Sequence, residues 1–501
     1  MPHLMEISPR AGELAGESER VDLNKLLEAY EREHPDVNIP AQKVKFGTSG
    51  HRGSSLDLSF NEDHIIAITQ AICNYRKTQG ITGPLFIGYD THALSLSAYR
   101  TALTVLVGNG ITVFKSIEDE YTPTPVISHA ILNFNKNRIT GLADGIVVTP
   151  SHNPPEEGGI KYNSTHGGPA QASATQWIQA DANRILLLGV NKLSKMSWEQ
   201  ASCSDSLYDH DFVTPYIADL KNVIDLGKIR DTGLTVAVDP MGGAGVHYWD
   251  HIAELYDLNL IVTNREVDPS FKFIPRDWDG KIRMDPTSSF AMKPLIEQRN
   301  RFDISFACDT DHDRHGIVSA EGGLMSANQY LTAASFYLFG HRPLWSAELR
   351  LGKTVVSTEL LDRVARYYGR NIFEVPVGFK WFEYGLFKEE LALAVEESGG
   401  ASILRGSGGV WTTDKDGIVM GLLAAEITAT LGHDPWQLYH QVEESLGVAY
   451  DTRIDSSATQ EQMSRLAIIS PQQVQDQSLA GEKISQCETR ASGDFTTHWR
   501  D

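Results

Sequence analysis

Three times along this 501-residue chain, a short apolar run ends in a polar loop that carries the residue types of a binding or catalytic site. The runs GIVV, DISFAC and LALAV begin at residues 145, 303 and 391, and they lead into TPSHNPPEEGG, DTDHDRHG and EESGGAS. Between them, helical and strand-like apolar patterns alternate, which is typical of α/β layers with parallel or mixed sheets. Because ligands of open α/β sheets gather at the carboxyl ends of strands, we expect the three loops to face one cleft.

Apolar spacing predicts helices and strands along much of the chain. Helical spacing covers residues 21–33, 95–107, 211–226, 245–256, 289–298, 328–339, 360–368 and 414–431. Strand-like runs cover residues 84–90, 111–114, 145–150, 235–240, 259–262, 303–309, 353–359 and 392–395. The polar segment 192–209 is expected to be a linker. These patterns predict an α/β fold of three similar mixed-sheet domains.

The charge of the chain limits its partners. Its 44 Lys and Arg residues against 65 Asp and Glu residues give a formal net charge of −21. A chain this acidic is not expected to bind nucleic acid or an anionic membrane surface through its overall charge. If it binds phosphate groups, it needs a local pocket of cationic side chains.

Other features predict a soluble intracellular protein. The four cysteines are far apart and form no CxxC pair, and the polar, acidic N-terminus does not have the pattern of a signal peptide. No run of about 18 uncharged apolar residues occurs, as a membrane span would need. The most apolar segment, 417–432, contains Glu426 and is predicted to be a core helix. We therefore expect a cytoplasmic protein without a membrane partner, whereas the oligomeric state is not predicted.

The loop after the strand at 145–150 is the first candidate site. In TPSHNPPEEGGIKYN, residues 149–163, prolines stiffen the chain around Ser151 and glycines let backbone N–H groups approach an anion. The alternative is an ordinary turn in which Ser151 and Asn153 bond to their own backbone. Ser151 has no G-x-S-x-G around it, which excludes the nucleophile elbow of serine hydrolases.

Three aspartates follow the strand at 303–309. Asp309, Asp311 and Asp313 are spaced so that all three can turn toward one hard cation, and ligation by oxygen atoms alone favours Mg²⁺ or a related ion. The positions where an EF-hand requires glycine and a bidentate glutamate hold Arg314 and Ala320, which excludes that motif. The alternative, a solvated acidic turn, does not explain three acids directly after a buried strand.

Further candidates are weaker on their own. The stretch FGTSGHRG (46–53) suits a loop that contacts phosphate, with Arg52 as a charged fork, although loops rich in Gly and Ser are common. Glu396 and Ser398 can accept and donate hydrogen bonds to adjacent sugar hydroxyls, but a turn or helix cap is an equal alternative. Lys380 and Lys415 suit either a phosphate contact or a surface lysine.

Taken together and in this order, these stretches resemble the α-D-phosphohexomutase superfamily. The motifs TPSHNPPEEGGIKYN, DTDHDRHG, VPVGFKWF and TDKDGI carry the resemblance, which runs from about residue 43 to about residue 449. The closest likeness is to the bacterial glucose-specific phosphoglucomutases. The resemblance implies four domains around a central cleft. It also implies reversible interconversion of glucose 1-phosphate and glucose 6-phosphate through a phosphoserine enzyme and a glucose 1,6-bisphosphate intermediate.

The resemblance further implies roles for individual residues. Ser151 would carry the phosphoryl group, and one Mg²⁺ ion per chain would be bound by Ser151, Asp309, Asp311 and Asp313. His152 and Lys161 would be the candidates for acid–base catalysis, with Arg52 in the loop next to the phosphoserine. The substrate would contact Thr48, Ser49, His51, Arg314, His315, Lys380, Glu396, Ser398 and Lys415. Glucose 1,6-bisphosphate would act as the primer.

By the same resemblance the chain divides into five segments. They are an N-terminal extension with a helix (1–40), a phosphoserine domain (41–205), a metal-binding domain (206–325), a sugar-specificity domain (326–448) and a truncated start of a C-terminal phosphate-binding domain (449–501). We expect truncation because the R-x-S-G-T phosphate loop of the superfamily is missing, and RASG at 490–493 is followed by Asp494. A second departure is Val395, where the superfamily usually has glycine.

The sequence leaves two other functions open. Without the fourth phosphate loop, the chain could be a catalytically weak or non-catalytic relative that binds phosphosugars. It could also be a sibling of different specificity, a phosphomannomutase or a bisphosphate synthase, although EES at 396–398 favours glucose. In each case the expected partner is a small phosphosugar.

Overall fold

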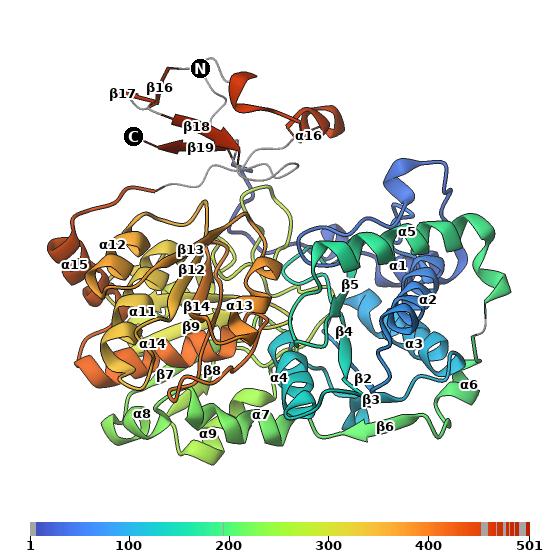
Figure 1. The fold of residues 1–501 in the computed structure, drawn as a ribbon, viewed down its shortest axis with the longest axis horizontal. Coiled ribbons are helices and arrows are strands. Elements are labelled where there is room, and N and C mark those ends of the chain that lie inside the picture. Colours follow the sequence, from blue (N-terminus) through green and yellow to red (C-terminus); the bar gives the residue numbers. More distant parts are fainter. Residues whose placement is uncertain are drawn as a thin grey trace.

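The computed structural model describes residues 7–193, 195–451, 459–466, 468–473, 477–479, 481–484, 486–489 and 497–500. Within these ranges, three α/β units with mixed sheets of six, five and four strands form the main body (Figure 1). The expected α/β class with three mixed-sheet domains is confirmed. In the part of the chain that is described, no helix is long and apolar enough to cross a membrane.

The first sheet joins its strands in the order β1-β5-β4-β2-β3-β6. The strands are β1 (His51–Ser54), β2 (Leu85–Tyr89), β3 (Val113–Ser116), β4 (Asp144–Val148), β5 (Glu157–Asn163) and β6 (Leu207–His210). Strand β2 pairs in parallel with β3 and β4, whereas β5 runs antiparallel to β4 and β1. The helices are α1 (Leu23–Arg32), α2 (Glu62–Gln79), α3 (Ala93–Gly108), α4 (Thr124–Asn135), α5 (Ala172–Leu188) and α6 (Trp198–Ala201).

Both faces of the centre of this sheet are buried. Successive side chains on a strand point to opposite faces. On β4, Ile146 and Val148 lie in the core formed with α2, α3 and α5, while Val147 between them lies in the core that includes α4. The continuous apolar run GIVV is therefore explained by a central strand with helices on both faces.

The segment 192–209, expected to be a linker, contains regular structure. It includes helix α6 and most of strand β6, and β6 pairs in parallel with β3. The first sheet therefore extends to His210, beyond the expected boundary at 205. The polar composition misled the sequence-based prediction because β6 is an edge strand whose side chains are partly or fully exposed, so it lacks the apolar pattern of the central strands.

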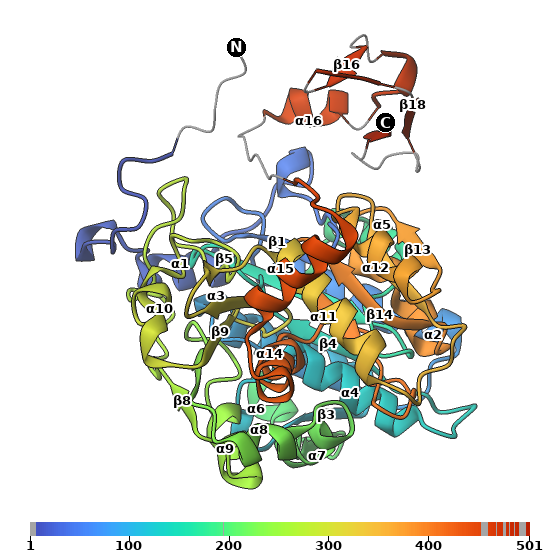
Figure 2. The same cartoon turned by 90° about the vertical axis from the view of Figure 1, so that its left-hand side faces the viewer.

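The second and third sheets have the orders β11-β10-β9-β7-β8 and β13-β12-β14-β15. Their strands are β7 (Val236–Asp239), β8 (Leu260–Val262), β9 (Ile304–Cys308), β10 (His315–Ser319), β11 (Gly323–Leu324), β12 (Arg350–Thr354), β13 (Ile372–Val375), β14 (Leu391–Glu396) and β15 (Gly400–Ile403). Their helices are α7 (Val213–Asp219), α8 (Leu226–Thr232), α9 (Tyr248–Tyr256), α10 (Lys293–Glu297), α11 (Ala327–His341), α12 (Leu360–Tyr367), α13 (Glu383–Phe387), α14 (Gly417–Leu431) and α15 (Pro435–Leu446). Figure 2 shows α15 lying along α11.

After residue 459, the described residues form a helix and two hairpins, which Figure 1 places above the main body. They are α16 (Gln460–Leu466), β16 (Ser478–Leu479) with β17 (Glu482–Lys483), and β18 (Gln486–Thr489) with β19 (Thr497–Arg500). The segment RASG at 490–493 lies outside the described residues.

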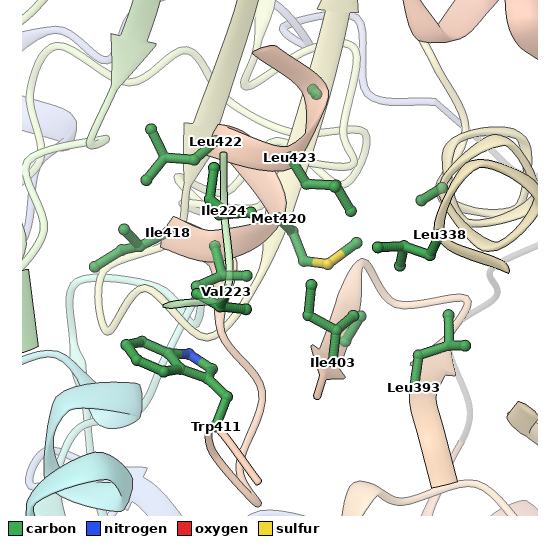
Figure 3. Packing of buried hydrophobic residues seen from close by; sticks show 14 of the residues in the cluster. Val223, Ile224, Leu338, Leu393, Ile403, Trp411, Ile418, Met420, Leu422 and Leu423 are labelled. Carbon is green, nitrogen blue, oxygen red and sulfur yellow. The ribbon is translucent and has the colours of Figure 1, made fainter. Parts of the chain in front are cut away.

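Helix α14 is apolar on every side because other elements enclose it. Its residues Ile418, Met420, Leu422 and Leu423 belong to one buried cluster with Val223, Ile224, Leu338, Leu393, Ile403 and Trp411 (Figure 3). At Gly421, a Cβ atom would lie 2.4 Å from the Phe306 ring, so the helix approaches β9 closely through a position without a side chain. The second and third sheets thus share one core around α14, which confirms the prediction of a core helix.

The single charge in α14 is neutralised within that core. Glu426 is fully buried, and its carboxylate accepts hydrogen bonds from Arg342 Nη1 at 2.7 Å and Nη2 at 3.0 Å. Tyr337 Oη at 2.9 Å and the Asp225 N–H at 2.8 Å complete its shell. A buried carboxylate with this many donors is satisfied, and it carries no sign of a functional role.

Replacing Glu426 with leucine is expected to destabilise the protein by about 3–5 kcal/mol, because Arg342 would keep its buried charge without a partner. Urea unfolding followed by circular dichroism measures the loss. As the control, Glu390→Gln removes the partner of Arg350 in an exposed ion pair and should change stability by less than about 1 kcal/mol. Equal losses for the two variants would contradict this account of α14.

Candidate active site

Ser151 lies in the turn that follows β4. It is 1% exposed, and its φ of +58° is in the left-handed region, which costs a residue with a side chain about 1–2 kcal/mol. The Ser151 N–H donates to Thr149 Oγ1 at 2.8 Å, which supports the turn from within. Gly159 on β5 lets the turn lie close to the sheet, because a Cβ atom there would be 2.2 Å from the Thr149 carbonyl oxygen.

The three aspartates occupy the turn between β9 and β10. All three are buried, and each presents an oxygen within 4.8 Å of the oxygens of the other two. Ser151 Oγ donates to Asp309 Oδ2 at 2.6 Å, so a hydroxyl of the first unit and the acidic turn of the second meet directly. The structure therefore brings together the two groups on which the expected chemistry depends.

The residues of this turn fit a bound cation. Asp311 Oδ1 and Asp313 Oδ1 are buried and have no hydrogen-bond partner. Burial, together with the charges of Asp311 and Asp313, holds the pKa of Asp309 well above its usual range. Three buried carboxylates, two of which have an oxygen without a hydrogen-bond partner, are suited to a hard divalent cation, which would remove both the desolvation penalty and the repulsion. Within the described residues, this is the acidic cluster that could hold a metal ion.

Two lysines partly neutralise the cluster. Lys161 on β5 donates from Nζ to Asp311 Oδ2 at 2.5 Å and to Asp313 Oδ2 at 2.9 Å, and Lys415 Nζ lies 3.3 Å from Asp313 Oδ2. Burial alone would lower the pKa of Lys161, but the two carboxylates outweigh it and the pKa is raised. In this arrangement Lys161 is a charged donor, whereas a general base would need a depressed pKa.

The side chain of His152 lies close to the Ser151 hydroxyl. Its Nδ1 is 3.5 Å from Ser151 Oγ, at the limit of a hydrogen bond. Burial and the nearby charge of Arg314 hold the pKa of His152 well below its usual range, so its ring is neutral and has a nitrogen that can accept a proton.

Two arginines add positive charge around the serine. Arg52 Nη1 donates to Asn153 Oδ1 at 2.9 Å, within the Ser151 loop. The Arg314 N–H donates to Asp309 Oδ1 at 3.0 Å, while its Nη1 lies 3.4 Å from the Ser398 carbonyl oxygen of the third unit. Burial and the charge of Arg314 lower the pKa of Arg52, which agrees with two cations sharing one site. A local cationic environment therefore exists within a strongly acidic chain.

The sugar-reading candidates lie at the end of β14. Glu396 is buried, and its Oε1 accepts the Gly378 N–H at 3.1 Å, which ties it to the loop that carries Lys380. The turn after β14 also meets the acidic turn, because the His315 N–H donates to the Gly399 carbonyl at 2.9 Å. All three polar loops therefore meet at one place, as their positions after strands predict.

A pocket connects the 46–50 loop with the third unit. Its lining residues come from the first unit, from Lys380 and from Asp414, next to Lys415. They include Thr48, Ser49, Lys161, Lys380 and Asp414. Lys380 is half-buried, with Nζ 5.5 Å from the centroid of the Trp381 ring. The expected phosphate contacts of the first and third units thus border one space.

The structure does not bring His51 and His315 to the acidic cluster. The ring of His51 lies against the main chain, with Nε2 2.9 Å from the Ser59 carbonyl oxygen, and stacks on Phe60. The buried ring of His315 packs edge-on against Tyr330, and burial lowers its pKa to about 3. His51 is adjacent in the chain to Arg52, and His315 is adjacent to Arg314, and both arginines lie at the site. Adjacent residues of a strand point to opposite faces. Both side chains therefore point away from the site.

Sequence reasoning missed several residues that the structure places here. Thr124 donates its hydroxyl to Asp311 Oδ2 at 2.6 Å. Asp285 is buried, and although burial alone would raise its pKa, the charge of Arg314 and the hydrogen bonds from Thr287 lower it to about 2. Asp285 belongs to a long irregular segment without periodicity, and Thr124 begins a helix whose face cannot be assigned from spacing. The Asp-Pro pair at 285–286 was the one available signal, and it is weak because such pairs are common in turns.

Family models and relatives agree with this geometry. Models described as phosphoglucomutase/phosphomannomutase, alpha/beta/alpha domains I, II and III, match residues 43–187, 214–322 and 326–446. The chain is 51% identical over 487 residues to a phosphoglucomutase of Komagataeibacter xylinus, covering 97% of this chain and 88% of that protein. It is 26% identical over 406 residues to phosphoglucomutase 1 of Drosophila melanogaster, covering 76% of this chain and 68% of that protein.

Solved structures show the same fold. A putative phosphomannomutase from Thermus thermophilus superposes with a TM-score of 0.66 at 25% identity, covering 81% of this chain and 84% of that chain. The open form of parafusin, a phosphoglucomutase from Paramecium, gives a TM-score of 0.65 at 21% identity, covering 83% of this chain and 76% of that chain.

Proposed function

The chain belongs to the phosphoglucomutase/phosphomannomutase family, and from this premise we propose that it is a phosphoglucomutase that interconverts glucose 1-phosphate and glucose 6-phosphate. The observation that carries the proposal is the hydrogen bond from Ser151 Oγ to Asp309 Oδ2, at 2.6 Å, inside a buried acidic cluster. It puts a hydroxyl that can carry a phosphoryl group beside carboxylates that can hold a cation.

Ser151 would act as the carrier of the phosphoryl group. The bond between Ser151 Oγ and phosphorus breaks as the free hydroxyl of a glucose monophosphate forms a bond to the same phosphorus, and that hydroxyl gives its proton to a base. The departing Ser151 Oγ takes up a proton from an acid, so that the products are glucose 1,6-bisphosphate and a serine with a free hydroxyl. The other phosphate then returns to Ser151 by the reverse steps, after the sugar has turned over. The same bisphosphate, bound from solution, would phosphorylate the enzyme initially.

Asp309, Asp311, Asp313 and the phosphorylated Ser151 would hold one Mg²⁺ ion. When bound, the ion would offset the repulsion among these groups and withdraw charge from the transferring phosphoryl group. The chain contributes by fixing the oxygens: the Arg314 N–H holds Asp309, and Thr124 and Lys161 hold Asp311.

Two residues would take part in proton transfer. His152 is neutral and near Ser151 Oγ, and Lys161 is charged and in contact with the cluster. We assign them as the acid–base candidates, with Arg52 holding the serine loop through Asn153.

The remaining contacts would bind the substrate. Glu396 and Ser398 would form hydrogen bonds with two sugar hydroxyls. The same two side chains could bind these hydroxyls before and after the sugar turns over in the site. The phosphate that is not being transferred would meet Thr48, Ser49 and Lys380, which line the pocket, together with the cationic side chains of Arg314 and Lys415. His51 and His315 are left out of this set because they lie on the opposite faces of their strands.

The direct test is turnover. Purified protein with Mg²⁺ and a trace of glucose 1,6-bisphosphate should convert glucose 1-phosphate to glucose 6-phosphate, detected with a coupled dehydrogenase. Mannose 1-phosphate, followed in a parallel assay, should react far more slowly. Faster reaction with mannose phosphate would assign the chain to phosphomannomutases, and binding of glucose phosphates without turnover would overturn the proposed function in favour of a non-catalytic relative.

Glu396→Gln is expected to lower kcat/KM for glucose 1-phosphate about 10–100-fold, because the amide replaces a charged acceptor of sugar hydroxyls with a neutral acceptor and a donor. Glutamine keeps an oxygen for the Gly378 N–H, so the fold should be retained. The matched control is Glu397→Gln, next in the sequence, since Glu397 accepts from the Thr354 hydroxyl at 2.8 Å. If both variants behave alike, Glu396 does not read the sugar.

A further inference from the structure

Two buried charged groups beside the Ser151 loop have no part in the transfer described above. Asp90 follows strand β2, and His92 immediately precedes helix α3. Asp90 is 0% exposed and His92 is 3% exposed. The Asp90 N–H donates to the Val148 carbonyl at 3.1 Å, so Asp90 lies at the sheet edge where the chain leaves β4 toward Ser151.

Asp90 is connected to the first half of the loop through a hydroxyl. Thr149 Oγ1 donates to Asp90 Oδ2 at 2.6 Å, and Thr149 Oγ1 also accepts the Ser151 N–H at 2.8 Å. A hydroxyl has one proton, so giving it to Asp90 turns a lone pair toward the Ser151 amide. The carboxylate therefore orients the group that supports the turn.

His92 is connected to the second half of the loop. Its Nδ1 is 2.9 Å from Asp90 Oδ2, and its Nε2 is 2.9 Å from the Asn153 carbonyl oxygen. Asp90 accepts from Ser95 Oγ at 2.6 Å as well, as an ionised carboxylate does. Because a carboxylate and a carbonyl only accept, both ring nitrogens must donate, which requires the imidazolium form. Phe271 packs against this ring with a centroid distance of 4.8 Å.

The same junction holds the acidic turn. Thr310, between Asp309 and Asp311, donates its hydroxyl to the Ser151 carbonyl at 2.6 Å, and this hydroxyl also lies 3.1 Å from Asp90 Oδ2. The main chain of Ser151 is therefore fixed on its N–H side by Thr149 and on its carbonyl side by Thr310.

We propose that the Asp90–His92 ion pair is a positioning device that holds both ends of the 149–153 loop and thereby fixes the Ser151 hydroxyl against Asp309. Thr149 and Asn153 stand at equal distances along the chain on either side of Ser151. The left-handed backbone of Ser151 is a conformation that a non-glycine residue keeps only when its surroundings determine it, so a loop released at either end should relax. The inference rests on the proposed function, since the oxygen that is positioned is the phosphoryl carrier.

The test compares kinetic and structural effects in the same variants. His92→Gln breaks the link to Asn153, Thr149→Val breaks the link to the Ser151 N–H, and Asp90→Asn weakens both. In each variant a misplaced nucleophile should lower kcat about 100-fold with little change in KM. Thr149→Ser keeps the hydroxyl and should lose much less. Single-turnover transfer of labelled phosphate from Ser151 to glucose 1-phosphate should fall in parallel with kcat.

Asp144→Asn provides the matched control. Asp144 is an equally buried carboxylate at the other end of β4, 3.1 Å from Arg76 and bonded to the Tyr162 hydroxyl at 2.6 Å. Its loss should lower the melting temperature without lowering kcat. The inference is overturned if His92→Gln and Thr149→Val keep wild-type kcat, or if Asp144→Asn lowers kcat as much as they do. Thr149→Val and Thr149→Ser decide the matter if the charge variants fail to fold.

A second measurement separates the inference from the proposed function. In the wild-type protein labelled with ¹⁵N-histidine, the His92 signals, assigned by their absence in His92→Arg, should show two protonated ring nitrogens at pH 8. A neutral His92 ring would overturn the ion pair whether or not the protein has mutase activity. Absence of turnover in a wild-type protein that shows the imidazolium would contradict only the proposed function.

Discussion

Replacing Ser151 with alanine is expected to lower the interconversion of glucose 1-phosphate and glucose 6-phosphate by at least about 10⁴-fold. The account requires one oxygen from which the phosphoryl group leaves and to which it returns, and alanine has none. Alanine can keep the backbone of Ser151, including its positive φ, because the Thr149 and Thr310 bonds are made to main-chain groups. The coupled assay measures the loss.

The control for this variant is a buried serine elsewhere. Ser402 in β15 is 1% exposed and donates to the Thr412 carbonyl at 2.8 Å, so Ser402→Ala removes a hydroxyl and a hydrogen bond of similar kind. It should keep near wild-type turnover. Comparable turnover in the two variants would place the transfer at another residue.

Asp309→Asn is expected to abolish activity, by at least about 10³-fold, while it stabilises the metal-free protein near neutral pH. Burial and the charges of Asp311 and Asp313 raise the pKa of Asp309 in the folded state. The folded protein therefore holds this proton more tightly than the unfolded chain, and stability is lost as the pH rises from the unfolded pKa through the folded one. An uncharged asparagine avoids that loss at neutral pH.

Thermal unfolding with and without Mg²⁺ checks both halves of this prediction. In EDTA, Asp309→Asn should melt above the wild type; added Mg²⁺ should raise the melting temperature of the wild type and leave that of the variant unchanged. Asp434→Asn, which alters a carboxylate that caps α15, should keep the Mg²⁺ response. A wild-type protein without a Mg²⁺ shift, or a variant that retains it, would contradict a metal site at these aspartates.

The three strands that lead into the site loops could be predicted from the sequence, because their burial gives them continuous apolar runs. The runs GIVV, DISFAC and LALAV correspond to β4, β9 and β14, and the polar loops after them meet as expected. Buried central strands are apolar on both faces, and the residues just beyond them leave the core together. The sequence therefore predicts the Ser151 turn and the turn of three aspartates.

Helices and strands whose apolar residues form no regular pattern could not be predicted in the same way. Helix α2 was not predicted, because its buried residues lie on several faces and include polar ones such as His64, Thr69 and Arg76, so no apolar stripe appears. The polar sequence of strand β6 predicts a linker, because an edge strand tolerates polar side chains. Residues 350–354 form β12, whereas the sequence predicted 353–359, since apolar composition marks a buried segment more sharply than its ends.

The directions of individual side chains, and their partners far away in the chain, could not be predicted from the sequence. Motif membership suggested His51 and His315, but strand alternation turns both rings into the core. Asp90, His92 and Asp285 come from segments far from Ser151 in the chain, and no spacing rule links them to it. Asp90 and His92 reach the Ser151 loop through hydrogen bonds within the first unit, and Asp285 of the second unit interacts with the charge of Arg314, so these relations become visible only in three dimensions.

The most direct test of the central claim is to locate the phosphoryl group. The protein is incubated with glucose 1,6-bisphosphate and Mg²⁺, its intact mass is measured, and peptide mass spectrometry maps the added phosphate before and after a chase with glucose 1-phosphate. The account predicts one phosphate, on Ser151, that disappears in the chase as bisphosphate forms. A phosphate on another residue, or one on Ser151 that the chase leaves in place, would contradict it.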